Sequence, residues 1–458
     1  MNFTTEGTEG RGVRTNGEEK NSKPLCSSVP FDACRHLSPA LPPIVVNPSV
    51  VILGAGVVGL CTALECARRG FSVTVIDRKP RRRDGCSFGN AGMVVPSHFI
   101  PLAAPGMVSL GLKWMWNPES PFYIRPRLDP DLVSWGLRFW RAATRSRVEA
   151  AAPVLRDLGL LSRECFTSMG LDLGLVEKGL LMLCKEEQTL EEESHTAAKA
   201  NELGIPAEVL DARATAALDP AVKMDVYGSV WFPKDCHLSP GRFLAVLEEE
   251  LIRLGVVFHW ETEVLDFDTS DSRLKSVSTS SGSILGETFI LCAGVWSAET
   301  ARALRLNLPM QGGKGYSLTL TKPPQLPDLC SICTEARVAV TPMDGTLRFG
   351  GTMELAGTDE SIARRRVQGI IYAATRYFPA FAESDFAGIE PWRGLRPVSP
   401  DGMPYLGRTR RWKNLLVATG HAMMGLSLAP ATGRIVADLL EEKEPEVDLR
   451  LLDPERFG

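Results

Sequence analysis

The sequence predicts an α/β protein in which a discontinuous Rossmann-type domain carries an inserted α+β domain built on a mainly antiparallel sheet. First, residues 49–77 read as an apolar strand, a glycine-rich turn, a helix and a second strand. Second, apolar strand patterns that end in glycine return at residues 288–294 and 414–420. Third, short strand-like runs with turn signals fill residues 304–390. The chain is therefore expected to return to its first sheet after an insertion.

Composition narrows the class of protein. The 458 residues include 51 Lys plus Arg and 55 Asp plus Glu, and this slightly negative balance argues against nucleic acid as a partner. No apolar run reaches the roughly 18 residues of a membrane span, and no secretory signal precedes the first strand. Eleven cysteines, several at expected core positions, predict a reduced cytoplasmic protein. Residues 1–30 are poor in large apolar side chains, and residues 1–47 are expected to form a disordered extension, unless the start codon was placed too early.

Residues 49–79 carry a dinucleotide-binding pattern. Val50–Leu53 is an apolar run typical of a buried parallel strand. Gly54, Gly56 and Gly59 follow as G-x-G-x-x-G, in which the first glycine permits a tight turn and the second lets a pyrophosphate approach the backbone. The third lets the next helix pack on the strand, and Asp77 ends the second strand where an acid suits the hydroxyls of an adenosine ribose. The alternative is a chance glycine turn in an ordinary βαβ unit.

A second ligand-facing stretch covers residues 86–96. Small residues dominate it, with Ser87 and Asn90 as hydrogen-bonding groups, so this loop can lie flat against a large ligand. A flavin, which must also be held at its ring end, needs such a stretch more than NAD does. The basic run Arg78–Arg83 suits either a solvated loop, which we favour, or a 2′-phosphate of NADP.

The middle of the chain alternates helices and strands. Ser239 and Pro240 suit the N-cap and first position of a helix, and an apolar strand at 288–292 returns to the first sheet. Strand-like runs on both sides of the turn Met343–Thr346 indicate antiparallel pairing. Arg364–Arg366 is expected on a solvent-facing helix. The lone C-x-x-C of residues 330–333 has no second pair, so no metal site is predicted.

The patterns G-A-G-V-V-G, V-T-V-I-D-R and S-F-G-N-A-G resemble those of the FAD-dependent D-amino-acid dehydrogenases. That family belongs to a wider group with D-amino-acid oxidase, glycine oxidase and sarcosine oxidase. The resemblance runs from residue 49 to about residue 440. It implies an FAD-binding domain of residues 48–96, 232–302 and 391–458, with a substrate-binding domain of residues 97–231 and 303–390.

The resemblance also implies which residues contact FAD. Since some relatives attach their flavin through a cysteine and this chain has none between Gly394 and Gly425, we expect non-covalent FAD. The expected cofactor-binding residues are Gly54, Ala55, Gly56, Val57, Val58, Gly59, Asp77, Arg78, Ser87, Asn90, Ala91, Gly92, Met93, Val264, Ala293, Gly294, Gly420, Met424, Gly425, Leu426 and Ser427.

The stretch Trp392–Pro397 resembles the G-L-R-P element whose arginine binds the substrate carboxylate in amine-oxidising flavoproteins. A planar guanidinium grips a carboxylate with two parallel hydrogen bonds, so Arg396 is predicted as the clamp, with a structural salt bridge as the alternative. Tyr316 is a second candidate, as a hydroxyl donor to the carboxylate or amine, unless it only packs in the core. His421 is a candidate base, although lining the pocket suits it better.

A final helix is expected near residues 429–442, with its N-terminus toward the flavin pyrimidine edge. The resemblance implies hydride transfer from the amino-acid α-carbon to flavin N5, followed by hydrolysis of the released imino acid. Electrons would then pass to a quinone or an electron-transfer protein. A cyclic D-amino acid such as a D-hydroxyproline is one candidate substrate. An oxygen-using amine oxidase and a non-catalytic FAD-binding electron-transfer subunit stay open as alternatives.

Residues 101–147 hold four of the nine tryptophans. Leu132, Trp135 and Phe139 have helical spacing, which indicates packing in the substrate domain. Because tryptophan favours interfaces, a peripheral contact with the inner face of the plasma membrane is the alternative.

Overall fold

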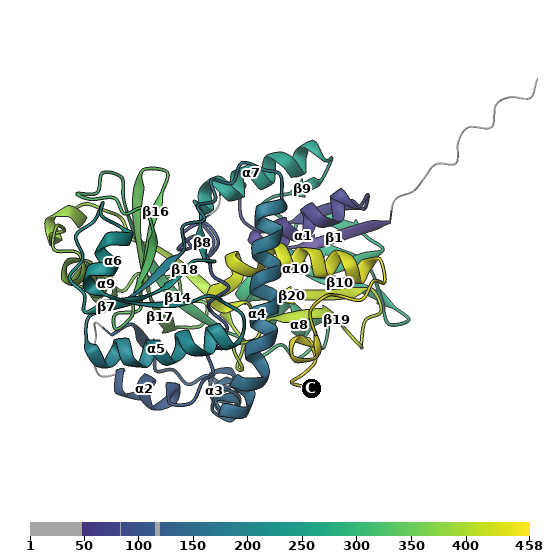
Figure 1. Cartoon of the computed structure of the whole chain (residues 1–458). Helices are drawn as coiled ribbons and strands as arrows, with labels where there is room; N and C mark the ends of the chain where they lie inside the picture. The colour runs from purple at the N-terminus through teal and green to yellow at the C-terminus, as the bar shows by residue number, and fades with distance from the viewer. Residues whose placement is uncertain (1–47, 83, 115–119) are drawn as a thin grey trace, which may run out of the picture. The chain divides into compact units, whose positions relative to one another are not determined.

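The computed structural model describes residues 48–82, 84–114 and 120–458, so the expected extension over residues 1–47 lies outside the described chain. Two large sheets organise these residues (Figure 1). Sheet A has the strand order β19-β20-β13-β1-β2-β9, and its pairs are parallel except β19 with β20. Its strands are β1 (Ser49–Leu53), β2 (Ser72–Ile76), β9 (Val257–His259), β13 (Thr288–Leu291), β19 (Tyr405–Arg408) and β20 (Leu415–Thr419).

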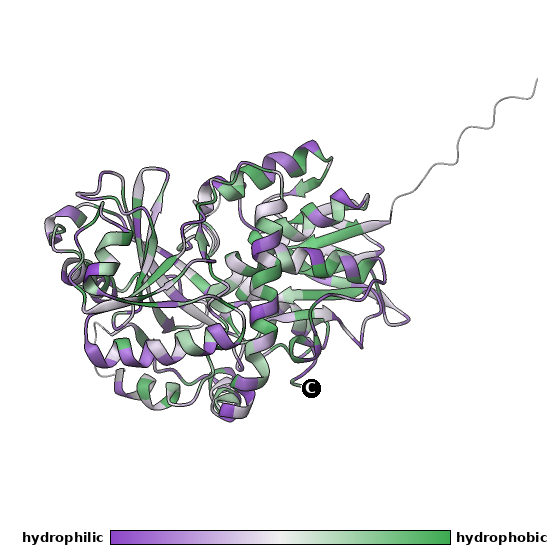
Figure 2. Cartoon of the chain, viewed as in Figure 1, coloured by the Kyte–Doolittle hydropathy of each residue, from purple (hydrophilic) through white to green (hydrophobic). Residues whose placement is uncertain are grey.

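Strand β1 shows why sheet A reads as continuous apolar runs. Val50 and Ile52 pack into one core cluster, whereas Val51 and Leu53 pack into another on the opposite face. Both faces of a parallel sheet are covered, so every side chain from Val50 to Leu53 is buried. The hydrophobic colour of β1 in Figure 2 follows from this position. Helix α1 (Val57–Arg68) covers the first face, where it packs between α7 (Pro240–Arg253) and α10 (Gly425–Leu440).

The opposite face of sheet A is covered by a three-stranded sheet and a short helix. These elements are β10 (Val264–Ser270), β11 (Arg273–Thr279), β12 (Gly282–Leu285) and α8 (Ser297–Ala303). Helix α4 (Arg145–Ser168) packs against α10 (Figure 1). A two-stranded sheet joins β3 (Met93–Val94) to β8 (Cys236–His237).

Sheet C has the strand order β18-β14-β17-β16-β15-β5-β7-β6, with β4 pairing β17. Most of its pairs are antiparallel, and the parallel ones are β15 with β5 and β17 with β4. Its strands are β4 (Phe122–Ile124), β5 (Leu180–Cys184), β6 (Glu208–Asp211), β7 (Gly228–Phe232), β14 (Gln311–Leu320), β15 (Cys330–Cys333), β16 (Val338–Met343), β17 (Thr346–Leu355) and β18 (Trp392–Val398). The remaining α-helices are α2 (Met107–Trp114), α3 (Pro130–Ala142), α5 (Glu187–Glu202), α6 (Ala212–Leu218) and α9 (Arg364–Tyr377).

The predicted fold class is confirmed. Sheet A draws its strands from three separate stretches of chain, and sheet C is mainly antiparallel. The residue boundaries of the two domains stay a prediction. Among the described residues, no helix has both the length and the apolar composition required to cross a bilayer.

Two local expectations were wrong. Helix α10 begins at Gly425 rather than near Ala429, because burial of its first turns outweighs the hydrogen bond that Pro430 cannot donate. On α9, Arg364 and Arg365 face solvent as expected, but Arg366 is buried. Its Nη1 donates to the Ser120 carbonyl oxygen at 2.9 Å, and its guanidinium lies 4.4 Å from the Tyr123 ring centroid.

Candidate functional site

A cavity of about 460 Å³ opens where several parallel strands of sheet A end. Gly54 follows β1, Asp77 follows β2, Ala293 and Gly294 follow β13, and Thr419 ends β20, and all of them line the cavity. Strands β2 and β13 flank β1 on opposite sides, so the chain leaves β1 at a point where the strand order reverses. Ligands of open α/β sheets bind at such a point.

The three glycines of the turn have separate physical roles. Gly54 adopts a φ of 115°, and a Cβ there would lie 2.5 Å from the Cys292 carbonyl oxygen. A Cβ on Gly59 would overlap the carbonyl oxygen of Gly54, so this glycine allows helix and strand to touch. Gly56 differs, since the nearest neighbour of its Cβ would be the Ser87 Oγ at 3.6 Å. The protein does not fill the space in front of Gly56, and a pyrophosphate fits there.

Asp77 is held firmly at the cavity edge. Its Oδ2 accepts the Ala55 N–H at 2.7 Å, and its Oδ1 accepts the Lys79 N–H at 2.8 Å. A carboxylate has about four acceptor positions, so both oxygens keep capacity for ribose hydroxyl groups. The residues present therefore fit the adenosine half of a dinucleotide.

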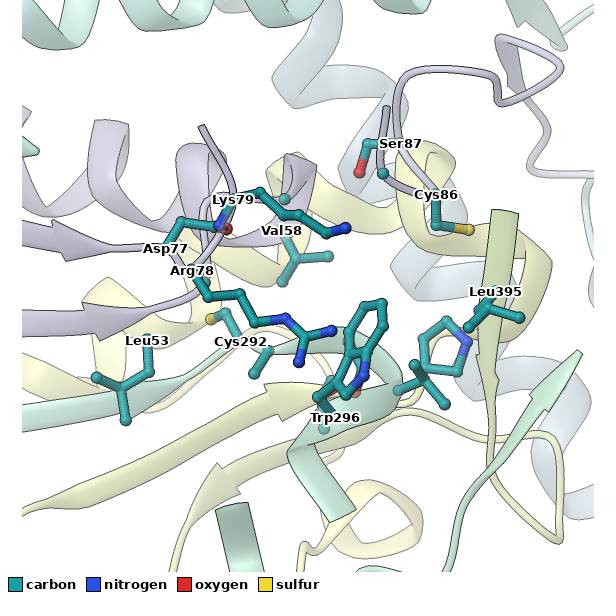
Figure 3. A pocket seen from close by; sticks show the side chains of 18 of the residues that line it. Leu53, Val58, Asp77, Arg78, Lys79, Cys86, Ser87, Cys292, Trp296 and Leu395 are labelled. Carbon is teal, nitrogen blue, oxygen red and sulfur yellow. Dashed lines mark hydrogen bonds between the residues drawn. The ribbon is translucent and has the colours of Figure 1, made fainter. Parts of the chain in front are cut away.

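Arg78 and Trp296 form one wall of the same end. The Arg78 guanidinium lies 4.0 Å from the centre of the Trp296 ring, a cation–π contact that Figure 3 shows inside the cavity. The sequence reasoning missed Trp296. The signal was present, because Trp296 stands two residues after the glycine that ends a buried strand.

The loop of residues 86–92 forms another wall. Ser87 Oγ accepts the Val57 N–H at the start of α1 at 3.0 Å, and Asn90 Oδ1 accepts the Gly92 N–H at 2.8 Å. Figure 3 shows Cys86 and Leu395 at one end of the cavity and Asp77 at the other. Cys86 also lines the cavity; it belongs to the stretch expected to face a ligand but was not among the expected cofactor-binding residues.

The structure sorts the expected cofactor residues by position. Those that line the cavity are Gly54, Gly56, Val57, Val58, Asp77, Arg78, Ser87, Asn90, Val264, Ala293, Gly294, Gly425 and Leu426. Those outside the lining are Ala55, Gly59, Ala91, Gly92, Met93, Gly420, Met424 and Ser427. Several of the second set shape the wall: Ser427 Oγ accepts the Val95 N–H at 2.9 Å, and Gly420 turns with a φ of 77°.

His421 lines the cavity with a neutral ring. Burial lowers its pKa to about 4. Its Nε2 lies 2.9 Å from the Thr432 hydroxyl, which donates its own proton to the Leu428 carbonyl oxygen at 2.8 Å. The hydroxyl therefore accepts from Nε2–H, which leaves the lone pair on Nδ1.

Strand β18 divides its side chains between two faces. Leu395 and Pro397 line the cavity, whereas Arg396 points to the other face of the strand and is not among the lining residues. The partly buried Arg396 guanidinium covers Gly315, where a Cβ would overlap it, and Nη1 donates to the Thr352 carbonyl oxygen at 2.6 Å. In the described chain no carboxylate lies within ion-pair distance of it, and burial lowers its pKa.

Cys86 connects this guanidinium to the cavity. The Cys86 Cα lies 3.1 Å from the position that a Cβ on Gly394 would take, and Gly394 is on the same face of β18 as Arg396. The Cys86 thiol is also close enough to Arg396 for an electrostatic interaction with its guanidinium.

Of the two expectations for Tyr316, the structure favours core packing. Gly313 pairs with Arg396 and Tyr316 pairs with Arg393, so Tyr316 and Arg396 point to opposite faces of the sheet. The Tyr316 ring is 1% exposed inside a core cluster, and its hydroxyl donates to Glu354 Oε2 at 2.7 Å. The competing interpretation of a packed tyrosine with a satisfied hydroxyl group is the one the structure supports.

Comparisons with known proteins agree with a dinucleotide-binding site. The family model for FAD dependent oxidoreductases (DAO) matches residues 49–439. D-amino acid dehydrogenase of Bradyrhizobium diazoefficiens is 32% identical over 422 residues, covering 89% of this chain and 99% of the relative. The enzyme of that name from Chromohalobacter salexigens is also 32% identical, with the same coverage. Among solved structures, glycine oxidase from Geobacillus kaustophilus has a TM-score of 0.70 at 24% identity, covering 89% of this chain and 98% of that one.

Proposed function

The chain belongs to the family of FAD-dependent oxidoreductases, and on that premise we propose that it oxidatively deaminates D-amino acids and passes the electrons to a quinone or an electron-transfer protein. Its relatives at 32% identity, matched over nearly their whole length, are named D-amino acid dehydrogenase. FAD, when bound, supplies the two-electron acceptor. Cyclic D-amino acids are among the candidate substrates.

The observation that carries the proposal is the Arg396 guanidinium. A partly buried charge with no carboxylate partner in the described chain is costly, unless a ligand completes it. A substrate carboxylate would accept the donors that Thr352 leaves free, and two parallel hydrogen bonds would orient the α-carbon. Arg396 itself is not a lining residue, but its neighbours Cys86 and Gly394 line the cavity, so Arg396 would hold the substrate beside the cavity wall that they form.

Other residues would hold FAD without a covalent bond. Gly56 and the start of α1 would receive the pyrophosphate, and Asp77 the ribose. The α10 N-terminus contributes Gly425 and Leu426 to the lining, and its positive dipole end would stabilise negative charge on the ring. The cavity-lining thiols of Cys86 and Cys292 have pKa values raised by burial, and a protonated thiol is a poor nucleophile for attachment.

In the described chain, no carboxylate lies among the contacts of Arg396. No such group is therefore placed there to take a proton from the substrate amine. His421 lines the cavity with Nδ1 unprotonated, but burial lowers its pKa to about 4, so it would be a weak base. We infer that the amino acid binds as the neutral amine, so that the protein supplies position and electrostatics rather than a strong base.

The test is anaerobic bleaching of the purified holoprotein by a panel of D- and L-amino acids that includes proline derivatives. Bleaching by D-amino acids with formation of the 2-oxo acid is expected. Bleaching by L-amino acids alone would contradict the assigned configuration, and no bleaching by any of them would favour a non-catalytic FAD-binding subunit. Stoichiometric hydrogen peroxide in air would instead indicate an oxidase.

We also propose a cytoplasmic protein with a peripheral membrane contact on α3. All cysteines of the described chain are free, as in a reducing compartment. On α3, Trp135 is buried, but Val133, Leu137 and Trp140 are 61%, 53% and 64% exposed along one helical stripe, beside the exposed Arg141. Flotation with phosphatidylglycerol vesicles should decrease when the three stripe residues become serine. Equal flotation of both proteins would reject the contact.

A further inference from the structure

We propose that Arg348, on strand β17 of sheet C, is the positioning residue that sets the backbone orientation of the cofactor-facing loop 86–91. Its guanidinium reaches from the sheet to two carbonyl oxygens of that loop. Nη1 donates to the Asn90 carbonyl oxygen at 2.8 Å and to the Phe88 carbonyl oxygen at 3.2 Å. Nε donates to Thr319 Oγ1 at 2.9 Å, which fixes the guanidinium plane from the β14 side.

Sheet C binds three consecutive carbonyl groups of this loop. Arg348 binds the carbonyl oxygens of Phe88 and Asn90. The carbonyl oxygen of the intervening residue, Gly89, accepts a hydrogen bond from the Ser317 hydroxyl at 3.2 Å. A Cβ on Gly89 would overlap the Trp392 indole, so the backbone itself lies against this face of the sheet. All three oxygens are therefore drawn toward β14 and β17.

This orientation matters because the loop is a cavity wall. Cys86, Ser87, Phe88 and Asn90 line the cavity. Carbonyl oxygens turned inward would present negative ends of dipoles to a pyrophosphate or to a flavin ring that gains negative charge. Turning them toward Arg348 removes that repulsion and leaves the small residues of the loop against the ligand.

Arg348 is an unusual choice for a purely structural contact. It has no carboxylate partner in the described chain, and its acceptors are all neutral oxygens. Burial lowers the pKa of its guanidinium to about 10, so the residue stays cationic at neutral pH. A lysine would carry the same charge but lacks the planar fork that serves the loop and Thr319 at once.

The experiment compares wild type with Arg348→Gln, Arg348→Lys and the control Arg365→Gln, an exposed arginine on α9. Three readouts are needed: the FAD dissociation constant of the apoprotein, the flavin absorbance spectrum, and amide hydrogen exchange of peptides that cover residues 86–92. We expect Arg348→Gln to weaken FAD binding at least tenfold, to shift the flavin bands, and to speed exchange of the loop even without FAD. Arg348→Lys should recover part of the affinity, and Arg365→Gln should match wild type.

Wild-type FAD affinity and loop exchange in Arg348→Gln would overturn the inference. If that variant does not fold, Arg348→Lys decides: a wild-type spectrum and wild-type exchange would overturn it equally. The inference rests on FAD as the cofactor, but failure of the inference and failure of the proposed function give different experimental results. Wild-type apoprotein that binds no FAD would remove the proposed function, whereas exchange of the apoprotein loop still reports on Arg348.

Discussion

Substituting the second glycine of the turn should separate cofactor binding from folding. Gly56 has an ordinary extended conformation, with φ −69° and ψ 173°, so valine introduces no backbone strain. Its Cβ would meet nothing closer than Ser87 Oγ at 3.6 Å, so the fold loses only the N-cap preference, about 1 kcal/mol.

The same side chain would occupy the space proposed for the pyrophosphate. Overpacking a well-fitted site costs about 1–3 kcal/mol. With about 1.4 kcal/mol for each factor of ten, the FAD affinity of Gly56→Val should fall roughly 5- to 150-fold. Gly59→Ala is the matched contrast, because its Cβ would overlap the Gly54 carbonyl oxygen and the helix must move away from the strand.

The assay is a flavin fluorescence titration of each apoprotein, with thermal unfolding measured in parallel. Gly56→Val should bind FAD roughly 5- to 150-fold more weakly and should unfold within a few degrees of wild type, whereas Gly59→Ala should lose several degrees. A normal flavin spectrum and affinity in Gly56→Val would refute the reasoning. An equal loss of thermal stability in the two variants would also refute the reasoning. The open space beside Gly56 would then not distinguish this position from the crowded position of Gly59.

Three further predictions follow from the site and the core. Arg396→Ala should raise KM at least about 100-fold with FAD still bound, because each hydrogen bond to a charged group contributes about 1.5–3 kcal/mol; steady-state kinetics and the flavin spectrum check this, and unchanged KM would remove the clamp. Tyr316→Phe should leave KM within about twofold but lower the free energy of unfolding by about 1–3 kcal/mol, since Glu354 loses a buried donor; denaturant titration measures the loss, and a large KM effect would restore Tyr316 to the site. Asp235 has its pKa raised to about 7, chiefly by burial, so its contribution to stability is full below the unfolded pKa near 4 and is lost as pH rises toward 7. Asp235→Asn should therefore gain stability relative to wild type between pH 4 and pH 7, and a difference that is flat with pH would contradict the raised pKa.

Interactions between residues close in sequence explain which parts of the site could be predicted from the sequence. The G-x-G-x-x-G turn, the apolar strands beside it and the acid that ends the second strand lie within about 30 residues. Backbone sterics and side-chain periodicity over that distance are enough to predict them. The predicted roles of Gly54 and Gly59 agree with the contacts that their missing Cβ atoms would make, and Asp77 lies at the cavity edge. The assignment of Arg396 as a clamp stays a prediction. Its lack of a described carboxylate partner is a property of the folded chain alone.

Contacts between distant segments decided several features that the sequence pattern did not show. Tyr316 and Arg396 lie on segments about 80 residues apart, and only the pairing of Gly313 with Arg396 shows that the two side chains point to opposite faces of the sheet. Arg366 is buried because Ser120 and Tyr123 reach it from β4 and the residues before it, which no helical periodicity reveals. Trp296 and Cys86 also line the cavity, although neither was among the expected cofactor-binding residues.

The sequence by itself determined the α/β class, the parallel strands and the glycine turn, since each depends on the conformational preferences of neighbouring residues. Tertiary structure alone decided which side chains of sheet C face the cavity, because register depends on contacts between strands distant in the chain. A shift of one residue in that register would exchange every side chain between the two faces.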